Sequence, residues 1–416
     1  MVKETLWTRN YTLLIVSSAL GAAGGIMGGF ALSFLVFDET GSTLAGALIV
    51  AIQLIPYFIV PIIAAPWMDR LPQKPFLVAG DAVGGVLYAL CGLYLMKYEF
   101  SYAGYLGFSL VLACIGSFDE LAYSSIYPKL IPGGMEQKGY AVSSTLYPVL
   151  KVIMMPLAAV ALDALGVALL LIIQGGASLL AAAAESRISI KEERRMDGGR
   201  FGFSMWREDI REAVRYLKKE KGLQNIYAYM SVTNGVAGGY SSLLVAFFRT
   251  MPGFTAAMYS FFSVAEFLGR TIGGAVQYKV RTPNDKKFAF TFLVYQVYEA
   301  MDMCLLWLPY PLMLLNRAIC GFLGVSSATL RQAAVQSYIP EKLRARINAF
   351  EGMVVTAACS LLSLAVGALG EVLDYRLCLT ACGALSMALC WITVWRGRAD
   401  VRRIYEARRS PVGDNS

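Results

Sequence analysis

Histidine is absent from the 416 residues of the chain, and only 16% of them are Asp, Glu, Lys or Arg. The missing histidine excludes imidazole metal sites, haem ligation through histidine and histidine proton relays. The charged fraction is well below the roughly 25% of a soluble domain. Any proton chemistry must therefore fall to carboxylates, and the composition argues against an ordinary soluble protein.

Functional cysteine patterns are also absent. All eight cysteines lie in apolar runs, none forms a CxxC pair, and Cys378 and Cys382 are one helical turn apart. We expect small buried helix residues without disulfides. The sequence also lacks a nucleophile with a base, a metal-ligand cluster and a phosphate loop. We therefore expect neither an enzyme nor a protein with a bound cofactor or metal.

Long hydrophobic runs dominate what is present. Hydrophobic residues make up 57% of the chain, and the mean hydropathy is +0.54. About 20 apolar residues suffice for a helix to cross a bilayer. The sequence thus predicts an all-α membrane protein with twelve transmembrane helices. The predicted spans are 11–37, 43–68, 75–96, 102–128, 140–162, 165–186, 224–248, 254–278, 287–308, 311–338, 347–370 and 375–396.

The positive residues predict the orientation. Thirty of the 37 Lys and Arg residues fall on one side of the predicted spans, and only Lys97, Arg249 and Arg376 fall on the other. Cytoplasmic loops carry an excess of Lys and Arg, so both termini are expected in the cytoplasm. The net charge of +8 is then explained by topology and lipid contact, and we expect no nucleic-acid partner.

A polar segment divides the spans into two sets of six. Within it, "SMWREDIREAVRYLKKEKG" places Trp206, Ile210, Val214 and Leu217 at helical spacing. This pattern predicts an amphipathic helix on the membrane surface. The predicted parts are an N-terminal half (1–186), a cytoplasmic linker (187–222), a C-terminal half (223–396) and a cytoplasmic tail (397–416).

A short internal repeat relates the two halves. "IPGGMEQKGYA" follows the fourth span, and "IPEKLRARINA" follows the tenth. Aligning Pro132 with Pro340 brings Lys138 onto Arg346. Two parallel six-span halves around a central site are typical of an alternating-access transporter.

The sequence resembles the major facilitator superfamily over nearly its whole length. "PWMDRLPQKPFLVAGD" is similar to the family's signature loop, with Asp69, Arg70 and Lys74 at the matching positions. Ala65 and Pro72 replace the glycines of that motif. The resemblance implies the major facilitator fold and a charged gate on the cytoplasmic side, in which Asp81 is expected to join the loop charges.

Three stretches resemble the bacterial drug-efflux branch that includes macrolide and enterobactin exporters. They are "LVFDETGST", "QLIPYFIVP" and "IPEKLRARINAF". Of the proline motif of antiporter span five, only Pro156 remains. This resemblance implies a monomeric exporter in the bacterial plasma (inner) membrane.

Charges inside predicted spans are the candidate site, because each needs a partner or a wet cavity. Asp119 and Glu120 are adjacent in the inner half of span four, and Lys151 is near mid-depth in span five. Neighbouring helix positions point about 100° apart, so one acid is predicted to pair with Lys151 and the other to carry a proton. A purely structural ion pair is the alternative.

Further charges are expected around the central cavity. Glu266, Arg270 and Arg331 are predicted to join Asp119, Glu120 and Lys151 in one network, although Glu266 and Arg270 could neutralise each other at their i, i+4 spacing. A second group lies nearer the outer face and is ranked lower. Its members are Glu299, Asp302 and Arg317.

Together these features predict a secondary transporter. The preferred interpretation is export of a small amphiphilic molecule by proton-coupled antiport, driven by a proton gradient. Six mid-span acids against four bases favour cationic or zwitterionic cargo. An importer or facilitator of a nutrient, lipid or siderophore is the alternative, because a fold does not settle function. A membrane enzyme or a channel is a more distant possibility.

Overall fold

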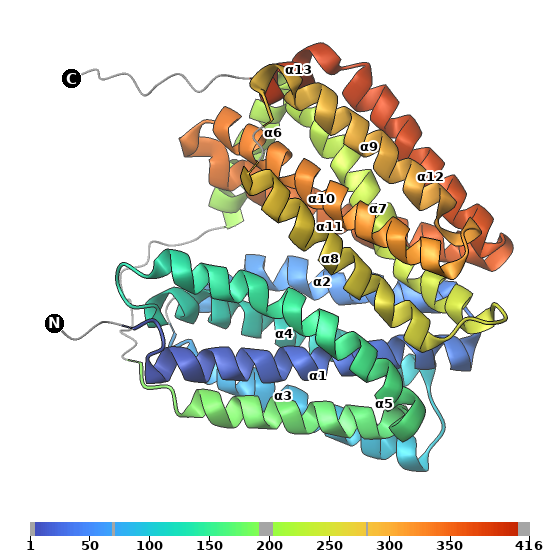
Figure 1. Cartoon of the computed structure of the whole chain (residues 1–416). Helices are drawn as coiled ribbons and strands as arrows, with labels where there is room; N and C mark the ends of the chain where they lie inside the picture. The colour runs from blue at the N-terminus through green and yellow to red at the C-terminus, as the bar shows by residue number, and fades with distance from the viewer. Residues whose placement is uncertain (1–4, 69–70, 191–202, 280–281, 407–416) are drawn as a thin grey trace. The chain divides into compact units, whose positions relative to one another are not determined.

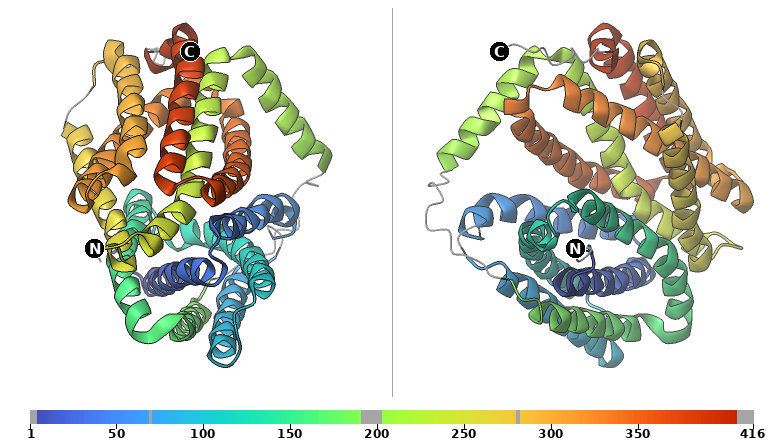
Figure 2. Two further views of the ribbon diagram at one scale, coloured as in Figure 1. Left: turned by 90° about the vertical axis from the view of Figure 1, so that its right-hand side faces the viewer. Right: turned by 60° about the vertical axis from the view of Figure 1, so that its left-hand side comes forward.

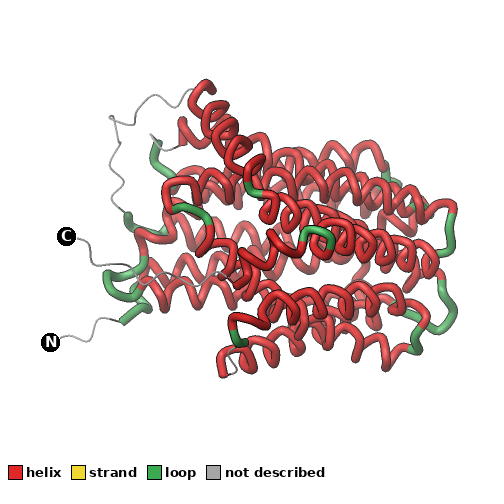
Figure 3. Tube along the Cα trace, turned by 90° about the horizontal axis from the view of Figure 1, so that it is seen from above, coloured by secondary structure: helices red, strands yellow, loops and turns green. Residues whose placement is uncertain are grey.

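The computed structural model describes residues 5–68, 71–190, 203–279 and 282–406 (Figure 1). Within these ranges the regular structure is helical, and Figure 3 shows helices joined by loops with no strand. The predicted all-α class is therefore confirmed. The chain divides into two compact units, which we call unit 1 and unit 2. Unit 1 is Met1–Phe201 with Phe248–Val264, and unit 2 is Gly202–Phe247 with Ala265–Ser416.

Five long helices form most of the described part of unit 1. Their ends follow local capping signals: Thr8 Oγ1 accepts a hydrogen bond from the Tyr11 amide, and Ser101 Oγ accepts one from the Gly104 amide. Such caps satisfy amides that have no partner within the helix. The helices are α1 (Arg9–Thr40), α2 (Thr43–Met68), α3 (Lys74–Lys97), α4 (Tyr102–Leu130) and α5 (Glu136–Ser186).

Helix α5 contains two of the predicted spans. Its backbone leaves the helical region at Gly166, where φ is 75° and ψ is 168°. Glycine adopts positive φ without the steric cost that a Cβ atom would add. The two arms of α5 therefore correspond to predicted spans 140–162 and 165–186.

Close helix contacts through small residues hold unit 1 together. Helix α1 lies beside α5, as Figure 2 also shows, and a Cβ atom at Gly24 would be 3.3 Å from the Ala177 Cβ. Helices α3 and α5 approach as closely, since a Cβ at Gly85 would be 2.8 Å from the Gly175 carbonyl oxygen. Small residues allow this approach in membrane proteins, where packing rather than water drives helix association.

Unit 2 contains α6, most of α7, the second part of α8 and all later helices. Short 3₁₀ helices, η1 (Asn284–Lys286) and η2 (Leu305–Trp307), flank α9, and a π-helical segment, η3 (Trp391–Trp395), follows α12. The helices are α6 (Phe203–Lys219), α7 (Lys221–Thr250), α8 (Ala256–Lys279), α9 (Lys287–Cys304), α10 (Tyr310–Tyr338), α11 (Glu341–Val372), α12 (Tyr375–Cys390) and α13 (Arg398–Glu406).

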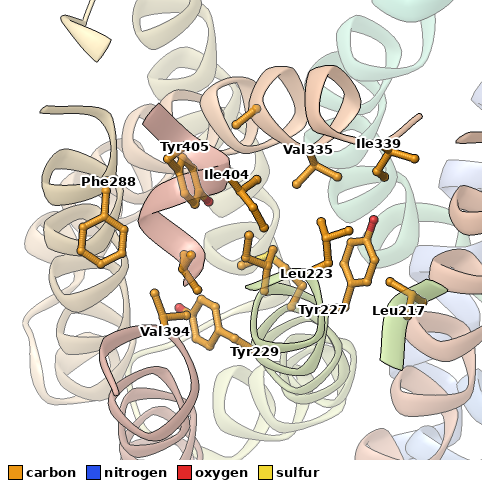
Figure 4. Packing of buried hydrophobic residues seen from close by; sticks show 14 of the residues in the cluster. Leu217, Leu223, Tyr227, Tyr229, Phe288, Val335, Ile339, Val394, Ile404 and Tyr405 are labelled. Carbon is orange, nitrogen blue, oxygen red and sulfur yellow. The ribbon is translucent and has the colours of Figure 1, made fainter. Parts of the chain in front are cut away.

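A buried core at one end of unit 2 includes residues outside the predicted spans (Figure 4). Helix α6 lies where the linker helix was predicted, and its Leu217 is buried in this core. The side chain of Trp206 lies outside the described residues. Helix α13 contributes Val401, Ile404 and Tyr405 to the same core. The C-terminal segment, predicted only as a tail, thus includes a packed helix.

Eight helices in the described ranges are long and apolar enough to cross a membrane, namely α1 to α5, α10, α11 and α12 with η3. Helices α7, α8 and α9 do not meet this criterion; α8 contains Glu266 and Arg270, and α9 contains Glu299 and Asp302. With these three added and α5 taken as two arms, each predicted span coincides with a helix. The chain is a multi-pass membrane protein.

Candidate functional site

A polar cavity of about 420 Å³ lies within unit 1. Its walls come from α1, α2, α3, α4 and α5. Four carboxyl groups line it. Three of them come from three different helices, Asp81 of α3, Asp119 of α4 and Glu185 of α5, and the fourth is Glu120, next to Asp119. Asp81, Asp119 and Glu185 are close enough to interact electrostatically with one another. We call these three residues the carboxyl cluster.

Tight packing of α4 on α3 positions Asp119. A Cβ atom at Gly80 would be 3.1 Å from Asp119 Oδ1 and 3.3 Å from the Asp119 Cβ. Glycine at this position therefore leaves room for the carboxyl group against the backbone of α3. The next residue of α3 is Asp81, so the same turn supplies both the space and a second acid.

The carboxyl cluster is partly buried and incompletely hydrogen-bonded: Glu185 is buried, whereas Asp81 and Asp119 are half-buried. Asp119 Oδ1 and Glu185 Oε2 are both buried and have no hydrogen-bond partner among the described residues. Glu185 as a whole is only 3% exposed. Burying an unpaired carboxylate is costly, whereas a protonated carboxyl group carries no charge. The arrangement therefore favours proton binding by at least one member of the cluster.

No compensating cation is found in this cavity. Of the described residues, no Lys or Arg lines it, and its other polar walls come from hydroxyl and amide groups such as Ser17, Ser178 and Gln174. The described residues also include no group of three or more acidic, cysteine or histidine side chains arranged to hold a metal ion. The observation that bears on chemistry is the set of carboxyl groups, because a carboxyl group can bind and release a proton.

The predicted partnership of Asp119, Glu120 and Lys151 is wrong in one respect. Glu120 lines the same cavity as Asp119, but its side chain is exposed. Lys151 is exposed as well and forms no ion pair with a described residue. Asp119 is instead brought beside Asp81 and Glu185, because α4 packs on α3 and α3 on α5. Whether these acids carry protons stays a prediction.

The four predicted gate residues are only partly described. Lys74 Nζ donates a 2.7 Å hydrogen bond to the Ser186 carbonyl oxygen. Asp81 lies in the carboxyl cluster, about two turns further along α3. Asp69 and Arg70 lie outside the described residues, so a gate formed by the signature loop stays a prediction.

Two of the predicted central-cavity charges pair with each other. Arg270 and Glu266 form an i, i+4 ion pair on α8, with an N–O distance of 2.8 Å, and the two side chains are 53% and 39% exposed. The structure therefore contains the self-neutralising alternative. The single network that would join these charges to Asp119 stays a prediction.

The group that was ranked lower is the more deeply buried in unit 2. Arg317 pairs with Asp302, and their side chains are 10% and 4% exposed. Glu299 Oε1 accepts hydrogen bonds from the Tyr229 hydroxyl at 2.9 Å and the Thr233 hydroxyl at 2.8 Å. These charges already have protein partners, which favours a structural role.

Arg331 lines a second cavity, of about 320 Å³, within unit 2. The other charged residue that lines this cavity is Glu351 of α11. Tyr227, Gln336 and Asn348 complete the polar lining. Both units therefore contain a polar cavity, but the charges differ: acids alone in unit 1, and an acid with a base in unit 2.

Sequence reasoning missed Glu185. The residue is the penultimate position of α5, next to Ser186 and Arg187, and so looked like a helix end in water. Its burial comes from the packing of α5 against α1 and α3. A weak signal was present, since Glu185 closes an otherwise apolar "LLAAAAES" run within predicted span 165–186.

No protein-family model and no curated protein sequence matches the chain. Solved structures do match. A nucleoside transporter, NupG, aligns with a TM-score of 0.69 at 11% identity, covering 94% of this chain and 100% of its own. A POT family transporter in complex with 5-aminolevulinic acid aligns with a TM-score of 0.70 at 11% identity, covering 94% and 96%.

A bacterial homologue of the human lysosomal transporter Spinster aligns with a TM-score of 0.65 at 13% identity, covering 97% of this chain and 94% of its own. At such low identities the similarity shows the fold alone. The chain thus has the major facilitator fold that these transporters share, as the sequence predicted. None of these three structures is named as a drug exporter.

Proposed function

We propose that the chain is a secondary transporter in which the carboxyl cluster of unit 1 carries the coupling proton. The observation that supports this most directly is that Asp81, Asp119 and Glu185 line one cavity, with Asp119 Oδ1 and Glu185 Oε2 buried and no cation among the described lining residues. A group of this kind is poorly stable as a full set of anions. Proton uptake and release therefore change the stability of whichever conformation buries it.

The preferred cycle is proton-coupled export by alternating access. A proton enters from outside and neutralises Asp119 or a neighbouring acid, which stabilises the conformation that buries the cluster. On the cytoplasmic side the proton leaves, and the restored charge favours the other conformation. Protonation shifts the equilibrium between the two conformations as long as the free energy of proton binding is more favourable in one of them.

The cellular setting follows from the sequence. The distribution of Lys and Arg supports a cytoplasmic location for both termini, and the resemblance to bacterial exporters supports the plasma membrane of a bacterium. We infer a monomer embedded in lipid, with a small-molecule substrate and no bound cofactor.

Import of a small polar nutrient is the second candidate. It is favoured by the structural similarity to nucleoside and peptide transporters, with TM-scores of 0.69 and 0.70. The carboxyl cluster serves either direction, since the same protonation can drive symport or antiport.

The test uses everted membrane vesicles that hold a proton gradient and a fluorescent pH reporter. Cationic, zwitterionic and anionic amphiphiles, nucleosides and short peptides are added in turn, and substrate-evoked proton flux is recorded. The variants Asp81→Asn, Asp119→Asn and Glu185→Gln each remove one ionisable group at nearly constant size. Glu99→Gln, in the exposed loop between α3 and α4, is the matched control.

We expect substrate-evoked proton flux in the wild type and in Glu99→Gln, and its loss in Asp119→Asn. The sign of the flux separates antiport from symport. Proton flux that survives in all three cluster variants would contradict the proposal. Substrate flux without any proton movement in the wild type would instead indicate a facilitator.

A further inference from the structure

The unit 2 cavity contains two opposite charges that do not pair with each other. Arg331 of α10 and Glu351 of α11 both line its 320 Å³ and interact electrostatically. In the described part of the chain, however, no nitrogen of Arg331 lies within 4.0 Å of an oxygen of Glu351. The two charged groups therefore face one space from separate positions.

An unsatisfied hydroxyl group adds a second observation. Tyr227 lines the same cavity, is only 7% exposed, and its hydroxyl oxygen is buried without a hydrogen-bond partner among the described residues. Figure 4 shows this hydroxyl directed toward Val335 of α10 and Ile339, the residue that follows this helix. Buried hydroxyl groups nearly always have a partner, so this one is available for a ligand.

The amide wall of the cavity is fixed by its own hydrogen bonds. Gln336 Nε2 donates to Asn348 Oδ1 at 2.8 Å, and Asn348 Nδ2 donates to Gln336 Oε1 at 3.2 Å. This reciprocal pair joins α10 to α11 close to Arg331 and Glu351 along the chain. It holds the two charge-bearing helices in register, which is the preorganisation that a binding site needs.

We propose that this cavity binds a small zwitterion, with its carboxylate on Arg331 and its ammonium group on Glu351. A guanidinium group suits a carboxylate because it offers parallel N–H donors. An anion or a cation alone would bring an opposite charge to one wall group and none to the other. The cavity volume is at the lower end of the range for small-molecule sites.

The inference rests on the proposed transporter function in one respect: the zwitterion is named as the class of substrate that the transporter would carry. Binding is measured on the purified full chain without any gradient. A failure of proton coupling would appear in the Asp119→Asn vesicle assay. A failure of the zwitterion site would appear in the binding assay, whatever the vesicles show.

The experiment measures binding by titration calorimetry with three matched probes. γ-Aminobutyrate carries both charges, butyrate only the negative one and butylamine only the positive one. Glycine, β-alanine and ε-aminocaproate then vary the distance between the charges. Arg402→Gln and Glu406→Gln, which alter an exposed ion pair on α13, are the controls for Arg331→Gln and Glu351→Gln.

We expect one ω-amino acid of the series to bind at least about tenfold more tightly than its single-charge analogues, because it gains a second charge-assisted contact. Arg331→Gln should weaken the zwitterion and butyrate but spare butylamine. Glu351→Gln should weaken the zwitterion and butylamine but spare butyrate. This crossed pattern would not arise from a structural role alone.

Charge-preserving variants cover the case in which a glutamine variant does not fold. Arg331→Lys and Glu351→Asp should keep the preference for zwitterions, and the shorter Glu351→Asp side chain should favour a longer probe. Equal weakening of all three probes would overturn the inference. So would the absence of binding by every probe at about 10 mM, well above a millimolar Kd.

A lipid headgroup offers the same chemistry as a free zwitterion. The titration is therefore repeated in phosphatidylglycerol nanodiscs with and without phosphatidylethanolamine. A lower affinity for the ω-amino acid when phosphatidylethanolamine is added assigns the site to a headgroup. An unchanged affinity assigns it to a soluble zwitterion.

Discussion

We predict that Arg317→Met destabilises the protein by about 3–5 kcal/mol, because it leaves the Asp302 carboxylate buried without its counter-charge. The magnitude follows from burial: the Arg317 and Asp302 side chains are only 10% and 4% exposed. An exposed pair would contribute no more than about 1 kcal/mol. Arg317 also donates to Asn316 Oδ1 at 2.9 Å through Nη2, and that hydrogen bond is lost as well.

The reciprocal variant separates charge from packing. Asp302→Leu leaves a guanidinium group that cannot be neutralised, since arginine stays protonated in proteins. The double variant Arg317→Met with Asp302→Leu removes both charges at similar volume. It should recover most of the stability that either single variant loses, because paired buried charges add little beyond a well-packed apolar pair.

The two single variants should differ in their dependence on pH. In Arg317→Met the isolated Asp302 can bind a proton, so its deficit relative to wild type should shrink as the pH falls. Each pH unit in the titrating range is worth about 1.4 kcal/mol. In Asp302→Leu the deficit should not depend on pH. Reversible unfolding in mixed micelles, followed by circular dichroism between about pH 5 and pH 8, measures both.

Two results would refute this reasoning. If both single variants lie within about 1 kcal/mol of wild type, the pair behaves as an exposed one. If the double variant is no more stable than the single variants, the loss comes from packing and not from an unpaired charge.

Two further predictions concern packing and pH. Gly85→Ala should destabilise the protein by about 1–3 kcal/mol relative to Gly84→Ala in the same unfolding assay. A Cβ atom at Gly85 would be 2.8 Å from the Gly175 carbonyl oxygen, whereas no other helix comes within 4 Å of a Cβ atom at Gly84. Equal stabilities of the two variants would contradict the α3–α5 contact. Burial raises the pKa of Tyr405 well above its usual value, with a further contribution from Tyr295. Above about pH 10 the tyrosine of the unfolded chain loses its proton while the buried phenol keeps it, so the protein becomes less stable as the pH rises. Tyr405→Phe removes this titration. It should therefore lose less stability than the wild type between about pH 10 and pH 12.

Most of the helices were predictable from the sequence because each depends on a local property, whereas α13 lies in a segment that was predicted only as a tail. Apolar runs of bilayer length gave every span, and Thr8, Ser101 and Gly41 cap helices as their residue types favour. The acids of the site were visible too, since Asp81 and Asp119 interrupt apolar runs. Their association was not, because it depends on which faces of α3 and α4 meet.

The partners of Asp119 were the part of the site that the sequence could not predict. Lys151 and Asp119 lie on consecutive predicted spans at similar depth, which made a pair plausible, but Lys151 lies on an exposed surface. Glu185 shows the converse, since a residue at the end of a helix is buried by its neighbours. Depth is a function of chain position, whereas rotation about a helix axis is set by packing.

The internal repeat explains why each unit has a cavity at all. The alignment of Pro132 with Pro340 also brings both ends of α4, Tyr102 and Leu130, onto both ends of α10. The same alignment places Tyr123 on Arg331 and Ser143 on Glu351.

All four of these side chains line the cavity of their own unit. The hollow therefore follows from the repeated helix arrangement, whereas its charge does not, because Asp119 aligns with the uncharged Ser327. Duplicated cavities with different charges can bind different ligands. The acids of unit 1 would bind protons, and the acid and base of unit 2 would bind a zwitterion. The two ligands then need not compete for one residue, and coupling requires only that each shifts the equilibrium between the same two conformations.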